Sequence, residues 1–284
     1  MGKGLLDPKV DFVFKNIFGS PNHPEILISF LNATLKAKNK IVNVDIKKTD
    51  IEKQYIEDKY SRLDVKATTS NDEIINIEIQ LKNENNMVKR SLYYLSKMYE
   101  EQLNEKEDYS KLVRTVCINI LNFKYLKTDN FHTGYRFKEI ESNEELTDIM
   151  EVHFIEIPKL QDSSDEKDML VAWTEFLKDP ESEKVRGLEL SIEEIRQAKD
   201  ELIRMSNDST QRELYDMRAN SLRDKMSELN AAERKGIEKG REEGREEGRK
   251  EEKIKIARNM KLSGLDTNTI AKVTNLSEDE IDKL

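Results

Sequence analysis

Apolar residues in the first third of the chain change from a helical to a strand-like spacing. Between residues 10 and 18 they recur at i, i+3, i+4, i+7 and i+8, at Val10, Val13, Phe14, Ile17 and Phe18. This spacing predicts an amphipathic helix, which Gly19 should end. A second helix is expected over residues 24–35, with Pro24 in its first turn. A strand is expected around residues 42–46.

Two segments that follow carry the pattern of a β-hairpin. SRLDVKATT and EIINIEIQLK are separated by a short polar connection at Asn71 and Asp72. In the second segment, apolar side chains alternate strictly with Asn76, Glu78 and Gln80. Alternation with period 2 places the three polar side chains on one face of a strand and the isoleucines on the other.

The remaining elements predict an α/β unit followed by helices. An amphipathic helix should start near residue 87, and the apolar run LVRTVCINILNF reads as a strand buried on both faces. YRFKEI and EVHFIEIPKL are expected to pair as strands, and a short helix carries the single tryptophan, Trp173. Residues 181–230 read as helices with fewer apolar positions.

Residues 231–253 contain an internal repeat, AAERKGIEKGREEGREEGRKEEK, with a glycine at every fourth position. Each glycine inside a helix costs about 1 kcal/mol relative to alanine, and neighbouring Glu/Arg pairs offset part of this cost. Two interpretations stay open. The glycines allow a second helix to approach closely in a dimerisation stalk, or the segment is a solvated linker.

The last 31 residues predict a small helical unit with its own core. Its expected apolar core residues are Ile256, Met260, Leu265, Ile270, Val273, Leu276, Ile281 and Leu284. Ser277 and Glu280 have the spacing of a capping box. Short helices joined by tight turns resemble a helix-turn-helix, although the last helix is acidic. The alternative is a helical cap for oligomerisation.

Composition and the lack of long apolar stretches argue against membrane-spanning and secreted proteins. Charged residues make up 37% of the 284 positions and hydrophobic residues 36%, with a net charge of −9. No apolar stretch approaches the length of a membrane span, and the N-terminus lacks the apolar run of a signal peptide. One cysteine, Cys117, cannot form an internal disulfide and is expected to be a small buried side chain. These features predict a cytoplasmic protein that makes no membrane contact.

Candidate chemistry lies on the predicted hairpin. If its strands pair around Asn71 and Asp72, then Asp64, Glu78 and Gln80 converge on one side of the sheet. Two carboxylates that meet inside a sheet repel each other, and a divalent cation such as Mg²⁺ removes this cost. The alternative is that these side chains form the solvent-exposed face of the hairpin.

Several segments resemble, in the same order, the bacterial family of recombination-promoting nucleases and related transposases. They are DPKVDFVFKNIFG, ILISFLNATL, SRLDVKA, INIEIQL and NMVKRSLYYLSKMYEEQL. This family belongs to the PD-(D/E)XK nuclease superfamily, and the resemblance is closest over residues 5–125. It implies a mixed central sheet flanked by helices, followed by an all-helical C-terminal region. It also implies cleavage of DNA phosphodiester bonds with Mg²⁺, for which Mn²⁺ can substitute.

The resemblance assigns roles to four residues, and strand parity adds a fifth. Asp64 and Glu78 match metal ligands, and Gln80 falls where the superfamily motif has lysine. Glutamine carries no charge, so Lys66, on the same strand face as Asp64, is a candidate for the missing cation. Asp11 on the first helix is a candidate for an additional acidic residue of the site.

Four segments and three functional hypotheses follow. The expected division is a nuclease domain over 1–180, a helical extension over 181–230, the stalk or linker over 231–253 and the terminal segment over 254–284. The leading hypothesis is a metal-dependent DNA endonuclease that forms a homodimer through its C-terminal helices and acts in recombination or on mobile elements. A nuclease-fold module that binds DNA or protein with little cleavage is the second hypothesis, and an oligomerising adaptor is the third.

Overall fold

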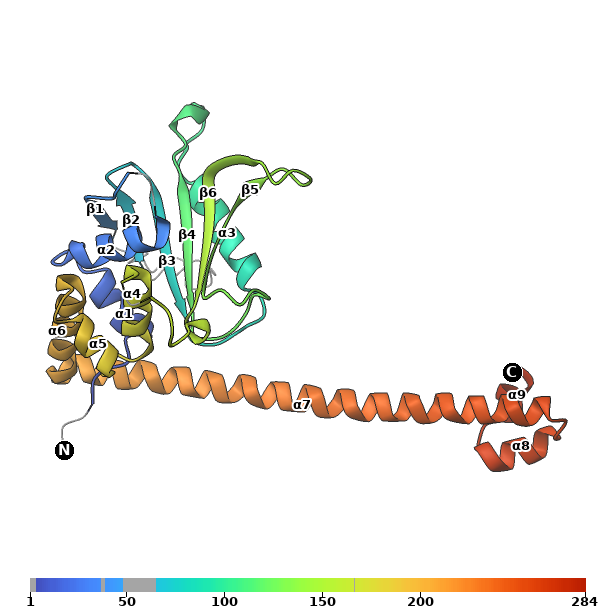
Figure 1. Cartoon of the computed structure of the whole chain (residues 1–284). Helices are drawn as coiled ribbons and strands as arrows, with labels where there is room; N and C mark the ends of the chain where they lie inside the picture. The colour runs from blue at the N-terminus through green and yellow to red at the C-terminus, as the bar shows by residue number, and fades with distance from the viewer. Residues whose placement is uncertain (1–3, 37–38, 48–64, 166) are drawn as a thin grey trace. The chain divides into compact units, whose positions relative to one another are not determined.

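The computed structural model describes residues 4–36, 39–47, 65–165 and 167–284. The chain divides into two compact units, Met1–Asn220 and Ser221–Leu284. The first unit contains all the strands of the described residues, and the second is helical (Figure 1).

Six strands among the described residues form one mixed sheet in the order β1-β2-β3-β4-β6-β5. Their bounds are β1 Val44–Lys47, β2 Val65–Thr69, β3 Ile74–Gln80, β4 Thr115–Leu121, β5 His132–Lys138 and β6 Glu145–Glu156. The central pairs β3/β4 and β4/β6 are parallel, whereas β1/β2, β2/β3 and β5/β6 are antiparallel. The mixed sheet flanked by helices confirms the expected fold class.

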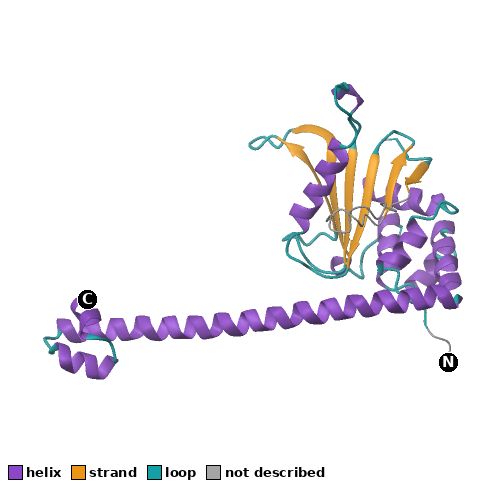
Figure 2. Ribbon diagram, turned by 180° about the vertical axis from the view of Figure 1, so that it is seen from behind, coloured by secondary structure: helices purple, strands orange, loops and turns teal. Residues whose placement is uncertain are grey.

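Helices of the first unit cover the two faces of the sheet, and the described residues of this unit include two short 3₁₀ segments. The α-helices of both units are α1 Asp11–Phe18, α2 Pro24–Leu35, α3 Met87–Glu100, α4 Met169–Lys178, α5 Glu183–Leu188, α6 Glu193–Asn207, α7 Ser209–Leu262, α8 Thr267–Thr274 and α9 Glu278–Asp282. The 3₁₀ segments are Tyr109–Lys111 and Ile157–Lys159. Helix α3 packs on β4 and β6, on the face opposite to the group of helices that contains α2 and α4 (Figure 2).

The local patterns explain where these elements begin and end. Helix α2 starts at Pro24 as expected. Helix α1 ends before Gly19, where an added Cβ atom would lie 2.6 Å from the carbonyl oxygen of Lys15. Strand β1 starts at Val44, two residues later than its pattern indicates. The predicted hairpin forms, with Val65 opposite Ile77 and Asp72 in the left-handed region (φ 61°) at its turn.

The core of the first unit lies on both faces of the sheet. Every residue of β4 is buried, as a strand between two parallel neighbours and two helical layers requires. On the helix-rich face, Trp173 packs edge-on against Phe18 at 5.3 Å and against Phe176 at 6.0 Å between ring centroids. These large buried rings anchor α1 and α4 around the sheet.

The glycine repeat lies inside α7 and is helical. No heavy atom outside the helix backbone lies within 4 Å of a Cβ atom built at Gly236, Gly240, Gly244 or Gly248. Within the described chain, the glycines therefore have open space around them, which leaves both the stalk and the linker interpretations available. Every helix of the described residues is too short or too polar to cross a lipid bilayer.

The terminal helical unit confirms the capping box and corrects part of the expected core. Ser277 and Glu280 exchange both capping hydrogen bonds at the start of α9. The buried core consists of Ala257, Ile270, Leu276 and Ile281. The expected core residues Ile256 and Val273 are instead 43% and 60% exposed, and Leu265 is also exposed.

The error at Ile256 has a simple geometric cause. Helix α7 presents Ile254, Ala257 and Met260 to the small core, and these residues recur at intervals of three. Ile256 lies about 100° away from Ala257 around the helix axis, because each residue turns an α-helix by that angle. A small alanine at the centre of the contact lets α8 approach, so the larger side chain beside it points outward.

Candidate functional site

The polar side chains of β3 lie on the face of the sheet that α3 covers. In the parallel register, Asn76 is opposite Cys117, and Glu78 is opposite Asn119 of β4. Cys117 belongs to the apolar cluster beneath α3. The side chains that share its face of the sheet therefore point toward α3. Asn76, Glu78 and Gln80 therefore share one face, as the alternation predicts.

Glu78 is a buried carboxylate that contacts a single arginine of α3. Its side chain is 1% exposed, and its Oε2 atom accepts a hydrogen bond from Nε of Arg90 at 3.3 Å. The Nδ2 group of Asn76 lies 3.5 Å from Oε1. Burial raises the pKa of Glu78, and the positive charge of Arg90 opposes this rise. The ionised carboxylate thus occupies a site that disfavours its charge.

Arg90 is held between Glu78 and an aromatic ring. Its guanidinium carbon lies 5.4 Å from the centroid of the Tyr94 ring, one helical turn further along α3. Tyr94 is itself buried, so the ring provides a fixed surface for the cation. The Arg90 side chain is 27% exposed, and it therefore lies between the buried carboxylate and solvent.

Other polar groups fill the space around Glu78. Ser91 donates a hydrogen bond to Oδ1 of Asn119 at 2.9 Å. Cys117 is buried as expected, and burial raises the pKa of its thiol. The Oδ1 atom of Asn76 is buried and has no hydrogen-bond partner in the described structure. A buried acceptor without a donor is costly, which marks this oxygen as available to a ligand.

The structure places three of the other expected site residues as follows. Gln80 is half-buried on the same face as Glu78. Lys66 lies opposite Asn76, but its ammonium is 3.9 Å from Glu101, beyond the end of α3. Asp11 forms an ion pair with Arg218 of α7 at 3.0 Å.

Asp64, the expected second carboxylate, lies outside the described residues. Within the ranges that the structure describes, no group of three or more His, Cys, Asp or Glu side chains gathers closely enough to hold a metal ion. The donors present are nevertheless hard oxygens, because Glu78 offers a carboxylate and Asn76 an unpartnered amide oxygen. Such donors suit Mg²⁺ or Mn²⁺, so the described part of the site fits this metal class.

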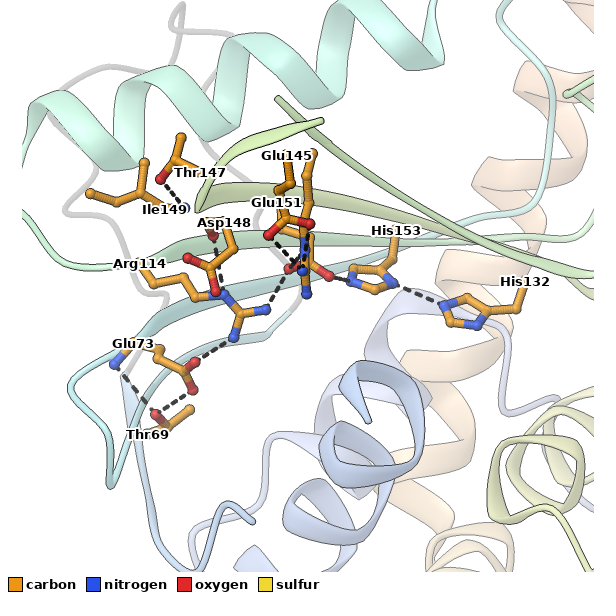
Figure 3. Close-up of polar contacts among 11 residues, drawn as sticks. Thr69, Glu73, Arg114, His132, Glu145, Thr147, Asp148, Ile149, Glu151 and His153 are labelled. Carbon is orange, nitrogen blue, oxygen red and sulfur yellow. Dashed lines mark hydrogen bonds and ion pairs between the residues drawn. The ribbon is translucent and has the colours of Figure 1, made fainter. Parts of the chain in front are cut away.

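A second polar network lies on the opposite face of the sheet (Figure 3). Arg114, which precedes β4, forms ion pairs with Glu73 and Glu151. Glu151 also accepts a hydrogen bond from Arg136 at 2.9 Å. Its Oε1 atom lies 2.6 Å from Nε2 of His153. The network thereby joins the β2–β3 turn to β4, β6 and β5.

Two histidines extend this network toward the helices. Nδ1 of His153 lies 2.9 Å from Nε2 of His132, and their rings stack. Burial, followed by the neighbouring His153 and Lys36, lowers the pKa of His132 to about 4. Burial opposes ionisation of Glu151, but hydrogen bonds from His153 and Arg114 outweigh it and lower the pKa of Glu151 to about 2. No sequence pattern predicts this network, because its members come from separate elements.

Replacement of His132 with glutamine is expected to reduce the loss of stability on acidification. The pKa of His132 is lower in the folded protein (about 4) than the ordinary histidine value of 6.5, so the unfolded chain binds a proton first as the pH falls. Stability is therefore lost from pH 6.5 to pH 4, by about 3 kcal/mol in wild type. Urea unfolding at pH 7.5 and 4.5 measures this difference.

The exposed His23 provides the matched control. His23→Gln should keep the wild-type pH dependence, whereas His132→Gln should flatten it between pH 6.5 and 4. Equal slopes for wild type and His132→Gln would exclude His132 as the group responsible.

Comparisons with known proteins agree with this geometry. A family model described as PD-(D/E)XK nuclease family transposase matches residues 8–232. A second model, described as the C-terminal HTH domain of the Rpn/YhgA-like nuclease family, matches residues 250–284. No curated protein and no solved structure is significantly similar to the chain.

Proposed function

The chain belongs to the family described as PD-(D/E)XK nuclease family transposase, and we propose that it is a metal-dependent DNA endonuclease whose site is centred on Glu78. The observation that carries this proposal is a buried carboxylate on the face of β3, beside an unpartnered amide oxygen and a cation. A buried charge of this kind is costly for stability alone, so a functional role explains its presence.

Four of the expected residues have a role in this proposal. Glu78 and Asp64 would hold Mg²⁺ or Mn²⁺, and the bound ion would supply Lewis acidity toward water and the phosphodiester. Gln80 orients the attacking water through its amide. Lys66, whose ammonium lies 3.9 Å from Glu101, would adjust the charge on this face of the sheet. Asp11 lies on α1, on the Ile77 face of the sheet, and pairs with Arg218, so this proposal gives it no part in the metal site. Hydrolysis adds one water across the phosphodiester, breaking one P–O bond and leaving a phosphomonoester and a hydroxyl.

The alternative function is a nuclease-fold module that binds DNA or protein and cleaves little. Gln80 favours it, because glutamine cannot supply the positive charge of the superfamily lysine. Calorimetric titration with Mn²⁺ separates the two functions, since a site that has lost its chemistry should release no metal-dependent heat.

Relaxation of supercoiled plasmid tests the proposed activity. We expect nicking at about 5–10 mM Mg²⁺, because weak carboxylate sites bind this ion with low affinity. We expect no nicking in EDTA. Asp64→Asn should abolish nicking, since the metal would lose a charged ligand. Lys106→Gln, which replaces a residue in the loop before Tyr109–Lys111, is the control and should cleave as wild type does. Nicking that persists in EDTA would contradict the metal dependence.

The nuclease and helix-turn-helix domains imply DNA binding, and we propose that the protein acts as a homodimer in the cytoplasm on recombining or mobile DNA. Two copies would provide one site for each strand. The first turn of α9 carries Glu278, Asp279 and Glu280, which repel a DNA backbone, so this helix suits a protein contact better than a DNA groove.

Alanine at the four repeat glycines is expected to weaken dimerisation. Each change gains about 1 kcal/mol of helix propensity, but the added methyl groups would keep two α7 helices apart. Sedimentation measurements over a range of concentrations should show a wild-type dimer and a variant with a higher dissociation constant. A wild-type monomer at every concentration, or a variant that dimerises equally well, would remove the repeat from the interface.

A further inference from the structure

The candidate site contains a cation that the superfamily motif does not provide. Lys66, Lys89 and Arg90 are three of the basic residues on or beside this face of the described sheet, and their charges differ in placement. The ammonium of Lys66 lies 3.9 Å from Glu101, which follows the last residue of α3. Lys89 is exposed. Arg90 alone among the three has a hydrogen bond to Glu78, at 3.3 Å.

We propose that Arg90 supplies the positive charge that Gln80 lacks, pairing with Glu78 in the metal-free protein and with the scissile phosphate after Glu78 has taken a divalent cation as its partner. This inference rests on the proposed nuclease function and names the residue that completes its site.

The geometry gives Arg90 two partners in turn. A guanidinium has five N–H donors in a planar fork, which suits carboxylate and phosphate equally. The hydrogen bond to Glu78 in the described structure comes from Nε, and the fork carries four further N–H donors on its two terminal nitrogens. The Tyr94 ring, 5.4 Å from the guanidinium carbon, holds the cation over the site while it exchanges one anionic partner for the other.

Charge balance explains why the exchange would accompany metal binding. In the metal-free protein, Arg90 compensates a carboxylate that is 1% exposed, and a buried carboxylate without a counter-charge is strongly disfavoured. A divalent cation on Glu78 would repel the guanidinium and take over this compensation. The phosphate of a bound DNA strand would then be a new anionic partner for Arg90.

The experiment combines Mn²⁺ calorimetry at pH 8, plasmid cleavage and thermal unfolding of Arg90→Gln, Arg90→Lys and the neighbouring Lys89→Gln. Arg90→Gln should bind Mn²⁺ as tightly as wild type or up to about 10-fold more tightly, because like-charge repulsion is removed. Its cleavage rate should nevertheless fall about 100-fold or more, as when one donor to a developing negative charge is lost. Arg90→Lys keeps the charge without the fork and should lose about 10-fold.

The outcomes separate this inference from its premise. Wild type that neither binds Mn²⁺ nor cleaves would overturn the nuclease function itself. If wild type is active, three results would overturn the role of Arg90: Arg90→Gln cleaves within about 3-fold of wild type, it loses Mn²⁺ binding together with cleavage, or Lys89→Gln is equally impaired. The second result would mean that Arg90 only supports the carboxylate. The charge-conserving Arg90→Lys keeps the test valid if Arg90→Gln does not fold.

Discussion

Glu78→Gln is expected to abolish DNA cleavage while leaving the protein as stable as wild type or more stable. The carboxylate is the central metal ligand of the proposed site, and its loss should reduce cleavage by about 10³-fold, or roughly 4 kcal/mol of barrier. Plasmid nicking at saturating Mg²⁺ and calorimetric titration with Mn²⁺ measure the two functional losses.

The stability half of this prediction follows from the pKa of Glu78, which burial raises. An acid with a raised pKa in the folded state binds its proton more readily there than in the unfolded chain. Ionised Glu78 therefore reduces stability as the pH rises through that pKa. Glutamine removes the buried charge and keeps the shape, so the melting temperature at pH 8 should not fall.

Glu175→Gln provides a matched comparison, because Glu175 is also buried but lies in α4 with Lys184 as its partner at 3.1 Å. This change should reduce stability and leave the cleavage rate unchanged. If Glu78→Gln instead cleaves normally, or unfolds at a much lower temperature than wild type, Glu78 is a structural carboxylate.

The site on β3 could be predicted from sequence because its information is local. The strict alternation of β3 placed Asn76, Glu78 and Gln80 on one face, and the polar turn at Asn71–Asp72 fixed the hairpin. The ion pair between Glu78 and Arg90 depends on the way α3 lies across the sheet. The sequence spacing of 12 residues carries no signal for that contact. The pattern predicts that Arg90 opens a helix, where it can contact a DNA backbone, but not that it pairs with Glu78.

The network around Glu151 could not be predicted because its partners are distant in sequence. Glu73 and Arg114 are separated by 41 residues, and Arg114 and Glu151 by 37. The only local signal is that Glu151 and His153 share one parity in a mostly apolar strand. Such a pair is equally compatible with an exposed strand face, and only the packing of helices on that face shows that the two residues are buried.

Arg114→Met is expected to cause a large loss of stability through these contacts. The Arg114 side chain is 14% exposed, and its partners Glu73 and Glu151 are 10% and 4% exposed. Removal of one partner from a buried ion pair leaves an uncompensated charge and typically costs 3–5 kcal/mol, so we expect about 3 kcal/mol because other donors still reach Glu151. Urea unfolding at pH 7 measures this loss.

The comparison with Arg136→Met isolates the effect of burial, because Arg136 contacts the same Glu151 but is 33% exposed. We expect it to cost about 1 kcal/mol or less, as exposed pairs do. An equal loss in the two variants would show that burial of Arg114 does not set the cost.

The pH dependence gives a sharper test of the same network. In wild type the pKa of Glu151 is about 2, below the ordinary glutamate value of 4.5. Its ionised form therefore stabilises the fold above pH 4.5, and this contribution is lost as the pH falls toward 2. Without Arg114 the pKa of Glu151 should rise toward the unfolded value. The difference in unfolding free energy between wild type and Arg114→Met should therefore be greatest at neutral pH and decrease below pH 4.5. A difference that stays constant from pH 7 to pH 3 would mean that Arg114 acts through packing of its aliphatic stem, because only its charge couples to the protonation of Glu151.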